Sequence, residues 1–181
     1  VGVGALGFHA YLQRKGVPWE SALAKSANIR MFKHIRKGLD EANLKLGKER
    51  GEAPDAKDTG RRCSHVMAVA PNASSSIIMG NTSPSIEPWR ANAYRQDTLS
   101  GSFLNKNKYL DKLLRQKCEE DSSLDYDKLW SSIIANDGSV QNLKCLSEYE
   151  KDIYKTAMEI DQRWVIEHAA DRQEYIDQSQ S

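Results

Sequence analysis

The sequence predicts a mixed α/β fold in which helices predominate and strands are few and short. Two long segments, 19–50 and 146–176, carry apolar residues at spacings of three and four, which is the period of an amphipathic helix. A short apolar run, 64–70, stops at a proline and is typical of a buried strand. A length of 181 residues fits one domain with a substantial core.

The composition excludes several function classes. The 26 basic and 25 acidic residues leave a net charge of +1, without the basic excess of a nucleic-acid binder. No apolar run approaches the roughly 20 residues that cross a bilayer. The cysteines are far apart, form no CxxC motif and number three, which fits a reducing, cytoplasmic location better than a disulfide or zinc scaffold. The four histidines show no metal-ligand spacing, so we expect no metal site. From the charge balance and the short apolar runs, we expect no nucleic acid and no membrane.

The first part of the chain is expected to be helical. Residues 1–14 show an apolar face with small glycines, and the sequence Gly-Val-Pro at 16–18 breaks this pattern. Residues 19–50 form the clearest helix, on whose surface Arg36 and Asp40 lie one turn apart. Its apolar positions predict one buried stripe. They are Leu23, Ala27, Met31, Ile35, Leu39, Ala42 and Leu46.

The middle of the chain alternates irregular and short regular segments. Residues 51–62 are a polar loop that begins with the glycine ending the long helix. The expected strand 64–70 runs into a short helix, 72–79. Residues 80–89 contain two prolines and are expected to be irregular, and 94–103 are expected to be extended.

The last part is expected to be helical again. Residues 106–118 place leucines on one face, and 126–136 follow Asp125 and stop at an Asp-Gly turn. Residues 146–176 predict one long amphipathic helix.

A turn of small and hydroxyl-bearing residues joins the expected strand to the short helix. Its residues are Asn72, Ala73, Ser74, Ser75 and Ser76. The first N–H groups of a helix lack internal partners, and the helix dipole leaves positive charge there. Small residues let a phosphate approach and serines add donors, so the turn is a candidate phosphate cradle without a Walker lysine. Alternatively, Asn72 or Ser74 is an ordinary N-cap.

Ordered motifs carry a resemblance to a known family. The sequence reads PNASSSIIMGN at 71–81, SIEP at 85–88, NAY at 92–94 and LSGSF at 99–103. Together with the glycine-rich start 1–7, KERG at 48–51 and DQSQS at 177–181, these motifs resemble the large, catalytic subunit of class I ribonucleotide reductase. The resemblance covers essentially the whole chain and is weakest over 52–62 and 104–145.

This resemblance implies a fold and an activity. Residues 1–181 would be a C-terminal-half segment of a ten-stranded α/β barrel. The activity would be the radical-based reduction of ribonucleotides to deoxyribonucleotides for DNA synthesis, by an oxidoreductase that uses a cysteine thiyl radical. Asn72, Ala73, Ser74, Ser75 and Ser76 would bind the diphosphate of the substrate.

The resemblance also implies partners and cofactors. The partners would be a ribonucleoside diphosphate, the remaining parts of the large subunit, a small radical-generating subunit and a second large subunit. The small subunit would hold the metal and tyrosyl radical, and a thioredoxin- or glutaredoxin-type protein would supply electrons. This segment itself would bind no cofactor.

The catalytic residues of that family are not found in this sequence. The Asn-x-Cys-x-Glu arrangement of the radical cysteine and the adjacent tyrosine pair are both missing. Asn142–Glu148 has a similar composition but the wrong spacing, so Cys145 is expected to be an ordinary thiol. Glu87 is interpreted as structural, with a buried catalytic carboxylate as the alternative. We therefore expect an internal piece of a longer protein that is inactive in isolation.

An alternative function comes from a different class. The chain could be a non-catalytic helical scaffold or binding module, in which Asn72 to Ser76 only caps a helix. The ordered match over 71–103 argues against it.

Overall fold

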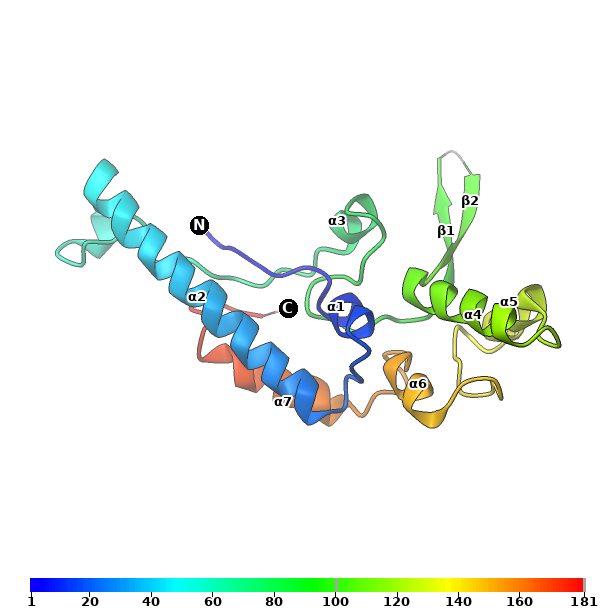
Figure 1. The fold of residues 1–181 in the computed structure, drawn as a ribbon. Coiled ribbons are helices and arrows are strands. Elements are labelled where there is room, and N and C mark those ends of the chain that lie inside the picture. Colours follow the sequence, from blue (N-terminus) through cyan, green and yellow to red (C-terminus); the bar gives the residue numbers. More distant parts are fainter. Residues whose placement is uncertain (100, 181) are drawn as a thin grey trace.

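The computed structural model describes residues 1–99 and 101–180 and is mostly helical (Figure 1). The elements are α1 (Phe8–Arg14), α2 (Ala22–Arg50), the short 3₁₀ helix η1 (Pro54–Ala56), α3 (Ala73–Ile78), β1 (Ala93–Thr98), β2 (Gly101–Lys106), α4 (Lys108–Glu120), α5 (Tyr126–Ala135), α6 (Glu148–Ile153) and α7 (Gln162–Gln173). Helix α7 lies along α2, and the β1–β2 hairpin lies at the opposite end of the molecule with α4 and α5. The mixed, mostly helical fold is as predicted.

Three extended segments lie side by side in parallel. Val3 bridges Met67 on one side of the middle segment, and Val69 bridges Gln180 on its other side. The predicted strand 64–70 is thus extended and lies between two other segments, but it forms only isolated bridges and not a regular strand. The prediction of helix over 1–14 is wrong for its first half, because α1 begins only at Phe8.

The glycines near the N-terminus explain this difference. A Cβ at Gly2 would lie 3.0 Å from the Cβ of Ala68, and one at Gly4 would lie 3.0 Å from the carbonyl oxygen of Ala68. These glycines therefore permit close approach between extended segments, which a helical interpretation of the same residues misses.

Helix α2 has the predicted end but a shifted buried face. Ser21 caps its start by accepting from the Ala24 N–H at 3.1 Å, and Gly51 ends it with φ 81°. Four residues of the predicted stripe pack, partly buried, against the apolar core, whereas Leu23 is 62% exposed. Each of the five buried positions of α2 lies one residue after a predicted stripe position. They are Ala24, Asn28, Phe32, Asn43 and Gly47.

The predicted long helix over 146–176 is wrong, because the structure divides it into α6 and α7. A capping box of Ser147 and Glu150 starts α6, and Asp161 caps α7 by accepting from the Arg163 N–H at 2.9 Å. Between the helices, the Ala157 N–H donates 2.7 Å to the carbonyl oxygen of Trp89. Long-range hydrogen bonding and two competing caps thus override the apolar period.

The extended segment predicted over 94–103 is an antiparallel hairpin. β1 pairs with β2 from Ala93↔Lys106 to Thr98↔Gly101. The hairpin extends away from the helices (Figure 1). The helices predicted over 106–118 and 126–136 are confirmed as α4 and α5, and Asp125 caps α5 as expected.

Three apolar clusters hold these elements together. One contains residues of β1, α4, α5 and α6, packed around Trp130 and Ile133. A second packs α1 against Trp19 and the region before α7. The third packs α2 on the middle extended segment through Phe32, Met67 and Val69. The third cluster fixes the segment that leads into α3. In the part of the chain that is described, no helix is long and apolar enough to cross a bilayer.

Candidate phosphate-binding site

The candidate site follows the carboxyl end of the middle extended segment. Val69 is the last paired residue of that segment, and Pro71 leads into α3. In α/β folds, ligands bind in the crevice outside the carboxyl ends of parallel strands. The loop Asn72–Ser76, called the phosphate loop below, lies at this position.

The geometry of Asn72 does not match an ordinary N-cap. Asn72 occupies the N-cap position of α3 with a left-handed backbone, φ 55° and ψ 30°, and its side chain makes no capping hydrogen bond. Its amide instead donates 3.5 Å to the carbonyl oxygen of Ala5, in the neighbouring extended segment. Asparagine tolerates this conformation better than most residues. The side chain that would compete for the first N–H groups is thus directed elsewhere.

The start of α3 leaves donors available. Within residues 1–99 and 101–180, the N–H groups of Ala73, Ser74 and Ser75 donate to no backbone or side-chain acceptor. The side chains of these three residues are exposed. A bound anion could therefore accept from successive N–H groups and from two serine hydroxyls.

Ser76 differs from the other loop residues. Its side chain is buried, and its hydroxyl donates 2.6 Å to the carbonyl oxygen of Ala73. Its N–H donates to the carbonyl oxygen of Asn72. Of the five predicted residues, Ser76 thus closes the turn, whereas Ala73, Ser74 and Ser75 present the free donors.

A cavity of about 390 Å³ adjoins the loop. Its lining includes Ala73 and Ser76 of the phosphate loop together with Trp89, Arg90 and Tyr94. Burial raises the pKa of Tyr94, against the opposing effect of its hydrogen bond to Asn81, so the phenol stays neutral. Tyr94 belongs to the NAY motif, but no sequence motif marked Trp89 or Arg90, which the fold of 80–92 brings to α3.

Arg90 adds positive charge beside the phosphate loop. The other arginine of the cavity, Arg95, pairs with Asp97 at 3.1 Å. Arg90 has no ion-pair partner in the described part of the chain and is exposed. Its guanidinium group is thus available to an anionic ligand.

The other candidate residues provide no catalytic or metal site in the described part of the chain. Glu87 is exposed within residues 1–99 and 101–180, which gives no support to the alternative of a buried catalytic carboxylate. Burial raises the pKa of the Cys145 thiol, which favours the protonated, unreactive form. Among the described residues, no group of three or more His, Cys, Asp or Glu side chains could hold a metal ion.

Comparisons with known proteins place this chain in a family. A family model described as "Ribonucleotide reductase, barrel domain" matches residues 54–181. The chain is similar to the ribonucleoside-diphosphate reductase large subunits of Invertebrate iridescent virus 6, at 58% identity, and Invertebrate iridescent virus 3, at 55%. Each match covers 100% of this chain, but 19% and 28% of the viral proteins.

A solved structure agrees with these matches. The class Id ribonucleotide reductase alpha subunit of Actinobacillus ureae matches with a TM-score of 0.89 and 42% identity. The match covers 99% of this chain and 32% of that protein. The chain thus spans between about a fifth and a third of the length of these relatives. On the family match and the shared fold, the chain belongs to the ribonucleotide reductase barrel-domain family.

Proposed function

We propose that this chain is part of the large subunit of a ribonucleoside-diphosphate reductase, and that its phosphate loop binds the diphosphate of the ribonucleotide substrate. The observation that carries the proposal is the set of free N–H groups at Ala73, Ser74 and Ser75, placed at the carboxyl end of the middle extended segment. The named relatives support the substrate class.

The chain's own contribution is binding and orientation. The N–H groups at the start of α3 hold the phosphate oxygens, the exposed hydroxyls of Ser74 and Ser75 add donors, and Ser76 keeps the turn closed. A diphosphate held at this point would fix the position of the attached ribose relative to the barrel, which is how binding groups favour a reaction.

The proposal extends to the complete enzyme. There the radical would come from a metal-bearing small subunit, and electrons would come from a thioredoxin- or glutaredoxin-type protein. The large subunit would form a homodimer and act in the cytoplasm. No residue of this chain is assigned to those partners.

Substitutions in the phosphate loop test the assignment in the complete large subunit. Ser75→Ala should weaken nucleoside diphosphate binding by roughly 1–2 kcal/mol, the scale of one hydrogen bond to a charged group. Ser74→Pro should weaken binding more, because proline removes a backbone donor. Ser26→Ala, at an exposed serine of α2, is the matched control and should leave affinity unchanged.

Affinity and melting temperature are measured together for all three variants. If Asn72–Ser76 were only a capped turn of a helical scaffold, Ser75→Ala and Ser74→Pro would lower the melting temperature and leave substrate affinity alone. That result would remove the phosphate assignment.

A further inference from the structure

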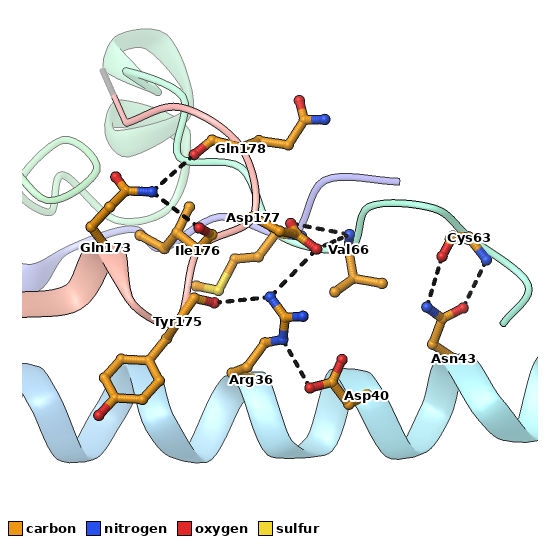
Figure 2. A network of polar contacts seen from close by, with 11 residues as sticks. Arg36, Asp40, Asn43, Cys63, Val66, Gln173, Tyr175, Ile176, Asp177 and Gln178 are labelled. Atoms are coloured by element: carbon orange, nitrogen blue, oxygen red, sulfur yellow. Dashed lines mark hydrogen bonds and ion pairs between the residues drawn. The ribbon is translucent and has the colours of Figure 1, made fainter. Parts of the chain in front are cut away.

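Four successive N–H groups of the middle extended segment, Val66–Val69, all have acceptors. The last two donate to the carbonyl oxygens of Val3 and Ser179, each at 3.1 Å. The first two donate instead to the carboxylate of Asp177, at 3.1 and 2.9 Å. One side chain thus takes the place of a backbone neighbour at the start of the segment (Figure 2).

Asp177 is itself held from α2. Arg36 lies 3.4 Å from the Asp177 carboxylate and 2.9 Å from that of Asp40, and it also donates to the carbonyl oxygen of Tyr175 (Figure 2). Burial opposes ionisation of Asp177, but the N–H groups of Met67 and Val66 and the charge of Arg36 lower its pKa overall. The carboxylate is therefore charged at neutral pH and accepts strongly.

We propose that Asp177 is a positioning residue for the phosphate loop, because it sets the register of Val66–Val69. This inference rests on the proposed function. The loop begins three residues after Val69, and a slip of one residue would move it by about 3.3 Å and turn every side chain of the segment to the opposite face. Such a shift would take the free donors at Ala73 to Ser75 out of reach of a bound diphosphate.

The register of the segment is set by polar contacts, namely the backbone hydrogen bonds of Ala68 and Val69 and, at its start, the carboxylate of Asp177. Met67 and Val69 are buried against α2, but an apolar contact is non-directional and does not select one hydrogen-bonding partner. The two hydrogen bonds from Val66 and Met67 to one carboxylate are directional and specify the alignment.

The second carboxylate partner of Arg36, Asp40, provides a matched control. Arg36 pairs with two carboxylates, and of these Asp177 accepts hydrogen bonds from the described segment 66–69, whereas Asp40 does not. Asp40→Asn removes the shorter ion pair and should therefore cost stability without altering the register. Asp177→Asn keeps the size of the side chain but loses its charge and one acceptor oxygen.

The test uses the complete large subunit and two readouts. In Asp177→Asn, nucleoside diphosphate binding should weaken at least about tenfold, because a displaced loop loses at least one hydrogen bond from its N–H groups to the charged diphosphate. Amide hydrogen exchange over 66–76 should rise in the substrate-free protein. Asp40→Asn should leave affinity and exchange over 66–76 near those of the parent, although its melting temperature falls. Should Asp177→Asn fail to fold, Asp177→Glu keeps the charge while displacing the carboxylate, and the same loss of affinity is expected.

The outcomes separate this inference from the function on which it rests. Equal affinity and exchange in the Asp177 and Asp40 variants would overturn the positioning role. If Ser74→Pro leaves affinity unchanged while Asp177→Asn still raises exchange, the phosphate assignment itself has failed, and the positioning role falls with it. If Ser74→Pro weakens binding but Asp177→Asn raises exchange without weakening it, the register has no influence on the loop and the inference is wrong.

Discussion

His9 is a fully buried histidine at the junction of several segments. Its Nδ1 accepts from the Trp89 N–H at 2.8 Å, and its other nitrogen lies beside the Gln13 amide. Gln13 in turn accepts 2.8 Å from Asn107, which also donates to Asn92. These polar groups satisfy one another inside the protein, which makes their arrangement specific and their disruption costly. The first of them, His9, had no distinguishing signal in the sequence.

The burial of His9 predicts a pH dependence of stability. Burial lowers the pKa of His9 to about 3, against the raising effect of a hydrogen bond to the Ile153 backbone. The unfolded chain therefore binds more protons between about pH 6.5 and 3, so the contribution is complete above pH 6.5 and is lost as pH falls towards 3. The free energy of unfolding should drop by at most about 1.4 kcal/mol per pH unit from this group.

Denaturant unfolding at several pH values measures this slope. His9→Gln should flatten the profile between pH 4 and 6.5, whereas His34→Gln, at an exposed position of α2, should leave it unchanged. An identical slope in the parent and the His9 variant would contradict the prediction.

One face of helix α2 packs against the backbone of the loop that follows it, as well as against side chains. Asn43 pairs with Cys63 through both backbone groups, accepting from its N–H at 2.8 Å and donating to its carbonyl at 2.9 Å. Gly47, one turn on, is buried against Gly60. The loop after α2 thus folds back on a polar and small part of the helix, which explains why its buried face departs from the apolar stripe.

Two glycines of α2 make a matched pair of substitutions. A Cβ at Gly47 would lie 2.0 Å from the carbonyl oxygen of Gly60, whereas a Cβ at Gly38 would meet nothing within 4 Å. Gly47→Ala should destabilise the chain by about 1–3 kcal/mol, because backbone must move. Gly38→Ala should stabilise it by up to about 1 kcal/mol through helix propensity. Thermal unfolding of both variants measures these opposite changes in stability. Stabilisation by Gly47→Ala would show that the loop does not rest on α2.

The chain exposes many large apolar side chains. Large exposed apolar side chains occur on α3, on the hairpin and around α7, and also at the N-terminus and on α2, α5 and α6. They include Ile78, Met79, Leu99, Phe103, Met158 and Ile166. In the described part of the chain, the outer extended segments pair on one side with the middle one. Exposed apolar patches and open strand edges mark surfaces that bind other chains or segments.

This surface predicts strong binding of a hydrophobic dye by the chain on its own. The fluorescence of the dye should fall when the chain is part of a complete large subunit, because the remaining barrel would cover Ile78 and the strand edges. A compact monomer that melts sharply and binds no dye would contradict both the prediction and the proposed place in a larger barrel.

The sequence predicted those features that depend on neighbouring residues along the chain. The period of α2, its end at Gly51, the cap at Asp125 and the residue types of the phosphate loop are local features, and they predicted these helices, the family and the candidate site. The remaining features depend on contacts between distant residues. The glycines at the N-terminus are extended because they lie against Ala68, and 146–176 is broken because Ala157 bonds Trp89. Asp177 completes the hydrogen bonding of a segment more than a hundred residues away. A local pattern cannot contain such pairings, because a buried backbone group takes whichever partner the folded chain brings to it.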